Sequence, residues 1–320
     1  MSTKFPKLLY SDTTRKKTVG LILSLFRLIL LIGISYVILY PLISKISVAF
    51  MDKNDLQDLT VKWIPRHFTL QNIKTVAKIL DYGQTVLKTF FVCGLVSVLQ
   101  VASCILAAYG FARFRFKGRG MIFALVIGTL LIPPQTYIVT LLTQFQNFDF
   151  LGIIKLFTSG RGINVLNTMW PFVLTGVTGT GIRAGLFIFL TRQTFRGMPK
   201  ELEEAAKVDG ANVMKTFISV MLPNIVSTVL VCFILTFVWQ WNDTFYVSVY
   251  ASELGLMAQK LDSLGVLVTT YLGGWSMVSD AYTGLLVSVG YLMGMLPLLI
   301  MFLFCQKFFI QGIERTGLVG

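Results

Sequence analysis

The sequence predicts an all-α membrane protein with six spanning helices and both termini in the cytoplasm. Of its 320 residues, 55% are hydrophobic and only 13% are charged, and the mean hydropathy is +0.73. A soluble domain of this size could not bury so much apolar surface. The net charge of +13 is also found in nucleic-acid-binding proteins, but here lysine and arginine cluster at the ends of apolar runs, as they do beside the cytoplasmic ends of membrane spans. We therefore expect a multi-pass protein that contacts the lipid bilayer and no nucleic acid.

Three apolar runs in the first half are long enough to cross a bilayer, which takes about 20 helical residues. A polar tail, residues 1–18, precedes them, and its lysines and arginines place it in the cytoplasm. The predicted spans cover residues 19–50, 86–112 and 120–142, with an outer loop at 51–84.

Two prolines, Pro133 and Pro134, interrupt the third span. Proline has no backbone N–H and its ring clashes with the preceding turn, so we expect the helix to kink or break there. Broken helices inside a membrane occur where they are buried in protein or line a cavity. The pattern fits a plain kink and a break at a cavity equally well.

Three further runs complete a membrane domain that we expect to extend over residues 19–306. Pro297 is expected to kink the last of them. The predicted spans cover 167–191, 224–246 and 282–304, with outer loops at 143–166 and 247–279 and a cytoplasmic tail at 307–320.

The sequence offers no catalytic or metal-binding constellation. His67 is the one histidine, and with no cysteine or histidine near it we expect a solvated loop residue rather than a metal ligand. The four cysteines lie inside apolar runs, where they are expected to pack in the core rather than form disulfides. Arg113 to Arg119 is rich in cations, but neither this stretch nor the rest of the chain has the spacing of a phosphate-binding P-loop. The chain therefore shows no sign of binding ATP through that motif.

A polar segment, residues 193–222, joins the fourth and fifth spans and has the pattern of two short helices. Pro199 suits the first position of a helix, and acidic residues follow it where the helix dipole favours negative charge. Spacing by three and four residues places one set of mostly small side chains on a single face, which another surface could approach closely. The set is Leu202, Ala205, Ala206 and Asp209.

Gly210 is expected to end the first helix in a left-handed conformation, and Asn212 to cap the second. Val213, Met214 and Phe217 form the apolar side of that second helix.

The segment resembles the cytoplasmic coupling loop in permease subunits of bacterial ATP-binding-cassette importers. The family pattern is Glu-Ala-Ala, three residues, Gly, nine residues, Ile or Val, one residue, and Leu-Pro. This chain matches it at Glu204, Ala205, Ala206, Gly210, Val220, Leu222 and Pro223. Two other segments, Trp63 to Asn72 and Phe187 to Gly197, are similar to the carbohydrate-type permeases. A surface hairpin without a partner is the plainer alternative, but it gives no reason for a face of small residues.

The resemblance implies the type I importer fold and a place in the bacterial cytoplasmic membrane. As partners it implies a second, similar permease subunit, two ATPase subunits that bind ATP and Mg²⁺, and an extracytoplasmic sugar-binding protein. The chain itself would bind no cofactor and would not be an enzyme. The identity of the sugar is left open, as is whether this subunit contacts it. ATPase coupling is assigned to Glu204, Ala205, Ala206, Asp209, Gly210, Leu222 and Pro223.

Arg183 stands inside the predicted fourth span, nine residues before Arg192. At 1.5 Å per residue this is about 13 Å into a hydrocarbon core about 30 Å thick. Arginine at that depth is costly and by default marks a functional site, although snorkelling or pairing with another subunit is an alternative. Its donors suit sugar hydroxyls or a carboxylate. Close helix packing is expected from the glycines around it, at positions 176, 179, 181 and 185.

Trp241, Asn242 and Asp243 lie near the outer end of the predicted fifth span. Aromatic faces and planar polar groups hold sugar rings, and a Trp-Asn-Asp sequence recurs in the family, so these three join Arg183 as substrate-pathway candidates. Trp239 and Tyr246 are expected to belong to the aromatic belt of the membrane interface.

Two other functions compete with ATP-driven import. A secondary sugar transporter driven by an ion gradient would require carboxylates within the membrane, and Asp243 at an edge is almost the only one that the spans provide. A structural membrane protein without transport leaves Arg183 and the interrupted third span unexplained.

Overall fold

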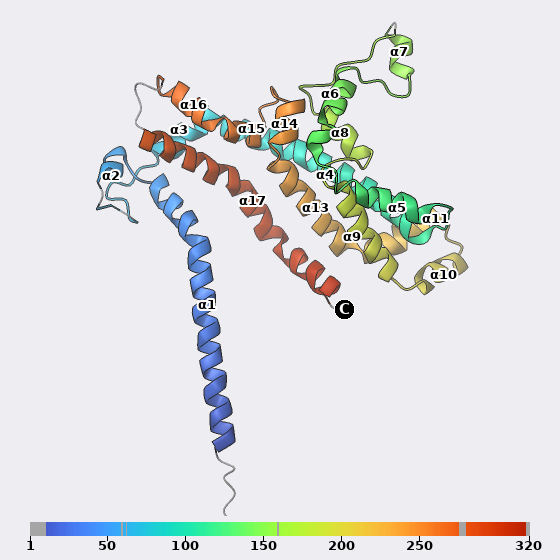
Figure 1. Cartoon of the computed structure of the whole chain (residues 1–320), viewed down its shortest axis with the longest axis horizontal. Helices are drawn as coiled ribbons and strands as arrows, with labels where there is room; N and C mark the ends of the chain where they lie inside the picture. Colours follow the sequence, from blue (N-terminus) through green and yellow to red (C-terminus); the bar gives the residue numbers. More distant parts are fainter. Residues whose placement is uncertain (1–10, 59, 62, 159, 275–279, 318–320) are drawn as a thin grey trace, which may run out of the picture.

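The computed structural model describes residues 11–58, 60–61, 63–158, 160–274 and 280–317 (Figure 1). In these ranges the chain is mostly helical, and its β-pairing is limited to two isolated bridges. Residues 1–10 of the predicted polar tail and residues 318–320 of the predicted C-terminal tail lie outside the described part.

Three helices in the described part are long and apolar enough to cross a membrane: α1 (Ser11–Ala49), α4 (Tyr82–Arg113) and α17 (Asp280–Gly317). They correspond to the predicted first, second and sixth spans. A fourth candidate span results if α13 (Val226–Trp241) is counted together with the helical segment Val213–Asn224, which precedes it at a bend. Pro297 lies inside α17 without ending that helix.

The predicted third and fourth spans are each divided into two shorter helices. The third consists of α5 (Arg119–Gly128) and α6 (Ile138–Gln146), separated by a single 3-10 turn at Pro134–Thr136. This confirms the interruption predicted at the two prolines. The fourth consists of α8 (Trp170–Val177) and α9 (Ala184–Gly197), so the span predicted over 167–191 is interrupted between these two helices, which its sequence did not indicate. A count of six spans therefore stays a prediction.

Helix α4 is the centre of the packing and contacts α8, α9 and α13. Small and β-branched side chains dominate its buried face, which lets the neighbouring helices come close. Cys93 and Cys104 belong to this face, and Cys232 of α13 is buried with them, as predicted. Cys305 of α17 was also expected in the core but is only half-buried; all four cysteines are free thiols.

Two glycines set the separation between helices. A Cβ on Gly176 of α8 would lie 3.3 Å from the Val96 carbonyl oxygen of α4. A Cβ on Gly185 of α9 would lie 2.8 Å from the Val126 carbonyl oxygen of α5. Any larger residue would push these helices apart, which confirms the close packing expected from the glycines.

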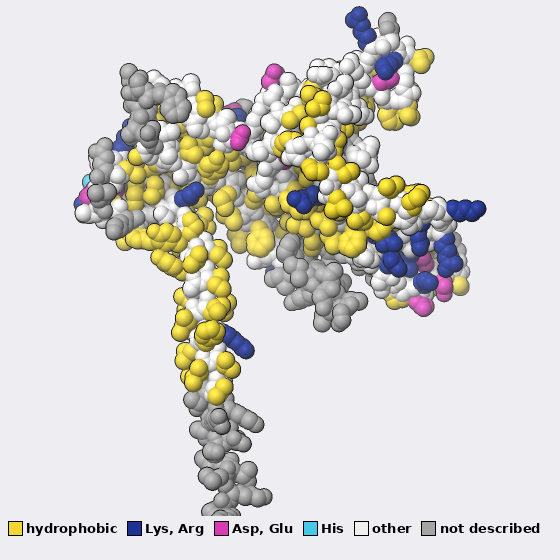
Figure 2. All heavy atoms as spheres, in the orientation of Figure 1, with side chains coloured by type: hydrophobic (Ala, Val, Ile, Leu, Met, Phe, Trp, Pro, Cys, Tyr) yellow, Lys and Arg dark blue, Asp and Glu magenta, His cyan; other side chains and the backbone are white. Residues whose placement is uncertain are grey.

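Helix α1 extends away from the rest of the molecule (Figure 1), and its most apolar stretch makes no buried contact with the chain. Figure 2 shows hydrophobic side chains along the part of α1 that it colours, and the exposed ones begin at Val19. Since water would not tolerate this surface, it is available to lipid.

The segments expected as outer loops contain short helices. They are α2 (Lys53–Gln57), α3 (Gln71–Leu80), α7 (Ile153–Phe157), α14 (Phe245–Tyr250), α15 (Met257–Asp262) and α16 (Leu264–Tyr271). Side chains of α3 and α16 form one hydrophobic cluster with α17.

Helix α15 is fixed to the end of α3 and to α4 by polar contacts. Lys260 Nζ donates hydrogen bonds to the Leu80 carbonyl at 2.6 Å and to Thr85 Oγ1 at 2.8 Å, and the Met257 N–H donates to Thr89 Oγ1 at 2.9 Å. The predicted third outer loop is therefore a packed part of the fold.

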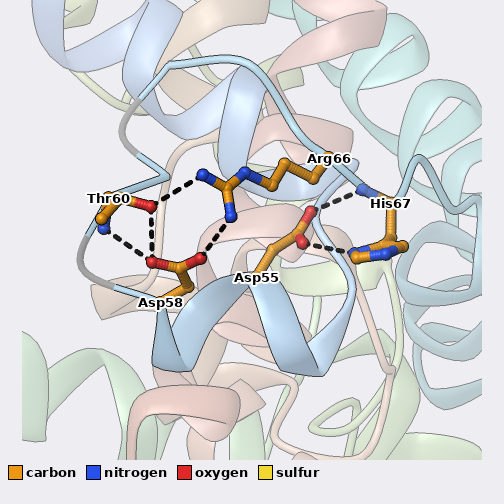
Figure 3. Close-up of polar contacts among 5 residues, drawn as sticks. All are labelled: Asp55, Asp58, Thr60, Arg66 and His67. Carbon is orange, nitrogen blue, oxygen red and sulfur yellow. Dashed lines mark hydrogen bonds and ion pairs between the residues drawn. The ribbon is translucent and has the colours of Figure 1, made fainter.

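Residues 51–70 are held by two carboxylates (Figure 3). Asp55 accepts the backbone N–H of His67 at 2.9 Å, and the His67 ring Nδ1 lies 2.8 Å from its other oxygen. Asp58 pairs with Arg66 at 2.7 Å and accepts hydrogen bonds from Thr60. His67 is exposed, as predicted, but its ring is tied to the loop.

Candidate functional site

The polar segment after α9 folds as two short helices, as its pattern predicted. The first is α10 (Glu201–Val208), which begins two residues after Pro199, with three glutamates in its first turn. The second begins with α11 (Val213–Thr216), continues as a π-helical turn, Phe217–Met221, and ends as α12 (Leu222–Asn224). This second helix meets α13 at a bend of 77°.

Local signals in the sequence fix the connection between these helices. Gly210 has φ +74°, the left-handed conformation predicted for it. The Asn212 side chain accepts the backbone N–H of Lys215 at 2.8 Å and so caps α11. At the other end, Pro223 removes a backbone donor, and the Asn224 side chain donates to the Val220 carbonyl at 2.7 Å.

The face predicted for α10 is divided in the structure. Ala206 is buried against its own chain, whereas Ala205 and Asp209 are exposed. The expectation that Leu202, Ala205, Ala206 and Asp209 offer one surface to a partner is therefore wrong for Ala206. Five apolar side chains of the segment are exposed, and we call them together the apolar loop surface: Leu202, Val208, Val213, Met214 and Ile218.

Phe217 anchors the segment in the helical core. Its ring centroid lies 4.9 Å from that of Tyr109 on α4, which in turn lies 5.3 Å from Phe195 on α9. Met221 is fully buried in the same cluster. The second short helix is thus packed jointly against α4 and α9.

An ion pair ties α10 to α4, and sequence reasoning missed it. Glu203 Oε1 lies 3.3 Å from Arg113 Nε, and the Tyr109 hydroxyl donates to the same oxygen at 3.3 Å. Arg113 also donates to the Met198 carbonyl at 3.0 Å. The side chains of Glu203 and Arg113 are 15% and 8% exposed, which places this pair inside the fold.

Glu204 behaves differently from its neighbour. Its side chain is exposed and forms no ion pair or hydrogen bond with another residue of the described ranges. The carboxylate is therefore available to a partner.

Arg183 is located in the break between α8 and α9, not within a helix. Its φ of 54° is left-handed, and it directly precedes α9. Its guanidinium carbon lies 4.9 Å from the Trp239 ring centroid on α13, a cation–π contact. Trp239 also contacts Phe187 at 5.4 Å, so this tryptophan, expected in an interfacial belt, packs on Arg183.

Helix α4 supplies the hydrogen bonds that the break requires. Gln100 Nε2 donates to the Ile182 carbonyl at 2.7 Å, and Ser103 Oγ donates to the Val177 carbonyl at 2.6 Å. Backbone carbonyls at a helix break need hydrogen-bond partners outside the helix, so these two side chains stabilise the backbone that presents Arg183. Gly181 leaves room for Gln100, whose side-chain oxygen would collide with a Cβ there.

The structure does not bring Trp241 together with Arg183. Trp241 is buried and donates from Nε1 to the Gly294 carbonyl of α17 at 3.2 Å. Trp239 and Trp241 are two residues apart, about 200° around the helix, so they occupy different sides of α13.

Asn242 and Asp243 follow the end of α13. Asn242 is exposed and donates to the Val238 carbonyl at 2.8 Å. Asp243 Oδ1 accepts the backbone N–H of Tyr246 at 3.2 Å, while its Oδ2 is buried and accepts no hydrogen bond from the described residues. Tyr246 was expected at the membrane interface. Its hydroxyl lies 3.1 Å from that of Tyr137, so it also forms a hydrogen bond within the chain.

Residues 101–315 match the model of a protein family described as the binding-protein-dependent transport system inner membrane component. Curated relatives align over most of their length. The probable ABC transporter permease YurM of Bacillus subtilis is 27% identical over 293 residues, 88% of this chain and 84% of that protein. The melibiose/raffinose/stachyose import permease MelC of the same organism is 28% identical over 265 residues, 82% and 86% of the two chains. The sn-glycerol-3-phosphate permease UgpE of Salmonella typhi is 25% identical over 291 residues, 89% and 93%.

A solved structure has the same fold. It belongs to a bacterial ABC transporter involved in the import of the acidic polysaccharide alginate, and it superimposes with a TM-score of 0.66 at 19% identity. The superposition covers 96% of this chain and 100% of that one.

Proposed function

The chain belongs to the family of binding-protein-dependent transport system inner membrane components, and on that premise we propose that it is the permease subunit of an ATP-driven importer of sugars or oligosaccharides. The relative YurM is named as a probable ABC transporter permease, and MelC as a melibiose/raffinose/stachyose import permease. The name of MelC supports this substrate class without deciding which sugar is carried.

The proposed assembly is a complex in the bacterial cytoplasmic membrane. This chain would pair with a second permease subunit, two ATPase subunits would bind ATP and Mg²⁺, and an external protein would deliver the sugar. Six spans would place both termini and the segment at 193–222 on the cytoplasmic side. The chain would itself perform no covalent chemistry.

The observation that carries the proposal is how this segment packs: one side is packed against the rest of the chain, and the other side is exposed. Phe217, Met221 and the Glu203–Arg113 pair attach it to α4 and α9. Glu204 and the apolar loop surface are exposed. Burying such a surface in a cleft of an ATPase subunit would be favourable by about 25 cal/mol per Å².

We assign roles in coupling to the residues that match the family pattern. Glu204 would accept a charge-assisted hydrogen bond from the ATPase, and Ala205 and Asp209 would lie at the contact. Ala206 would fix α10 to its own chain. Gly210 would set the angle between the two short helices, and Leu222 with Pro223 would set the turn into α13.

ATP-driven closure of the ATPase pair would then move this segment as a rigid lever. Tyr109 carries the motion into α4, and the bend into α13 carries it into the neighbouring span. The bundle would switch between inward- and outward-facing states.

The substrate pathway is proposed to pass Arg183. An exposed guanidinium on an aromatic ring offers donors to hydroxyls or to a carboxylate. Asn242 and Asp243 would contribute polar groups farther along, with buried Trp241 as support for their backbone.

Uptake by the complete transporter in proteoliposomes tests the function. Labelled sugars should accumulate only with ATP inside, should stop when orthovanadate blocks hydrolysis, and should continue when ionophores collapse the proton and sodium gradients. Uptake that follows the ion gradient and ignores vanadate would support a secondary transporter instead.

A further inference from the structure

Three arginines meet at one end of the seam between α5 and α9. Along the seam, the ring of Phe189 stacks with that of Phe123 at 6.4 Å, and the Arg192 guanidinium carbon lies 3.8 Å from the Phe123 ring centroid. Arg196 follows one turn later on the same face of α9. Arg119 is the first residue of α5. We call Arg119, Arg192 and Arg196 the arginine cluster.

The three charges lie close enough to act on one another. Burial lowers the pKa of Arg192, and Arg196 and Arg119 lower it further. Arginine still keeps its charge at neutral pH. Arg192 is 9% exposed, so its charge is held in a poorly solvated place, where a counter-ion is worth more than in water.

The contacts within the chain do not neutralise this cluster. Arg192 Nε donates to the Phe111 carbonyl at 3.3 Å, and Arg119 donates to the Phe114 carbonyl at 3.0 Å. Every ion pair among the described residues involves other cations. Guanidinium N–H groups therefore remain for an anion from outside the chain.

The surroundings of the cluster are apolar. On α5, the side chains of Met121 and Leu125 are 68% and 65% exposed, and on the preceding turn Phe116 is 44% exposed. Figure 2 shows hydrophobic side chains over α5 beside the lysines and arginines that gather around the end of α9 and the α10–α11 hairpin. A ligand that fits both parts carries a negative group on an apolar body.

We propose that the arginine cluster binds the headgroup phosphate of an anionic phospholipid, whose acyl chains lie along the exposed face of α5. Inorganic phosphate would satisfy the guanidinium groups only. A carboxylate from a partner subunit would also pair with the guanidinium groups, but it would not explain why the neighbouring face of α5 is apolar and exposed. The lipid accounts for both, and the inference does not depend on the proposed transport activity.

The test measures lipid retention by the full-length chain. The protein is placed in phosphatidylcholine nanodiscs that contain increasing amounts of phosphatidylglycerol, and native mass spectrometry after release counts the bound lipid. Wild type should retain phosphatidylglycerol in preference to phosphatidylcholine. The Arg192→Gln/Arg196→Gln variant should bind it at least tenfold more weakly, because the loss of one charge-assisted hydrogen bond already costs about tenfold and the variant removes two guanidinium groups.

An Arg115→Gln/Lys117→Gln variant is the matched control, because it removes the same charge from exposed positions in the neighbouring turn; its lipid retention should be unchanged. If the Arg192 variant does not fold, Arg196→Gln alone, at an exposed position, should still weaken binding. Millimolar inorganic phosphate in phosphatidylcholine discs should fail to protect the chain thermally as phosphatidylglycerol does.

Equal retention of the two lipids by wild type would overturn the proposal. So would unchanged retention in the arginine variants, or protection by inorganic phosphate alone. Unchanged retention together with lost binding of partner subunits would assign the cluster to a protein carboxylate.

Discussion

Glu203 and Glu204 are neighbours in sequence, yet exchanging each for glutamine should have opposite consequences. Glu203 is buried beside Arg113 and Tyr109, whereas Glu204 is exposed without a partner in the described structure. Glu203→Gln should destabilise the folded chain, while Glu204→Gln should leave stability unchanged and reduce transport.

The magnitude follows from the contacts. Neutralising Glu203 leaves the Arg113 side chain, 8% exposed, without its counter-ion. A buried polar group that loses its partner lowers the free energy of unfolding by about 1–3 kcal/mol. We expect a value in the lower half of this range for Glu203→Gln, because both contacts of the carboxylate are 3.3 Å long. Glu204→Gln is a surface exchange and should change stability by no more than about 0.5 kcal/mol.

Two assays separate these effects. Thermal unfolding of the purified chain should show a lower Tm for Glu203→Gln and a wild-type Tm for Glu204→Gln. Uptake by the assembled transporter should fall about tenfold for Glu204→Gln, the value of one charge-assisted hydrogen bond. Glu204→Lys should abolish uptake while the protein still reaches the membrane.

A double-mutant cycle with Arg113→Met completes the comparison. If the pair is the cause, the coupling between positions 113 and 203 should be clearly non-zero, and that between 113 and 204 should be near zero. Equal Tm values for both glutamine variants, or wild-type uptake by an assembled Glu204→Lys variant, would refute the reasoning.

Three further predictions concern other parts of the chain. Gly210→Val should uncouple ATP hydrolysis from uptake, because a β-branched residue is strained at the φ of +74° that Gly210 adopts, even though the space around a Cβ is open. Gly210→Asn should retain coupling, because asparagine tolerates this conformation. Equal behaviour of the two variants would contradict the argument. Hydrogen bonds from His67 hold the pKa of Asp55 below its usual 3.8, so the contribution of this carboxylate to loop order is present above about pH 4 and is lost as pH falls through the lowered pKa. Hydrogen exchange in residues 51–70, corrected for the intrinsic rate, should rise in that acid range in wild type, whereas Asp55→Asn should show no such step. Arg183→Gln should lose uptake of an acidic sugar selectively and Arg183→Lys should lose less, whereas an equal loss for neutral and acidic sugars would indicate a structural role.

The features that could be predicted from the sequence are those with local determinants. Gly210 and Asn212 act through their own backbone or one residue three positions away, so their conformations could be predicted. The interruption at Pro133 and Pro134 follows from the missing donors of those residues. The family pattern of the loop is equally local, and it led to the family that the comparison found.

The parts that failed depend on distant contacts. The break before Arg183 persists because Gln100 and Ser103, about 80 residues earlier in the chain, satisfy its carbonyls, and no pattern within 167–191 contains that information. Adjacent glutamates have the same local pattern, and the contacts with Arg113 and Tyr109 on α4 distinguish Glu203 from Glu204. The helices of the third outer loop are likewise fixed by Lys260 binding to Leu80 and Thr85.

The same distant contacts connect the two candidate regions through one helix. Tyr109 of α4 contacts Phe217 in the segment at 193–222, and Gln100 of α4 holds the carbonyl directly before Arg183. These two residues are nine positions apart, about 13.5 Å along an unbroken helix. A rigid helix cannot shift at one of these points without shifting at the other. Movement of the segment at 193–222 must therefore either carry the Arg183 break with it or disrupt a contact of Tyr109 or Gln100, and only the first outcome keeps the Tyr109–Glu203 and Gln100–Ile182 hydrogen bonds in place.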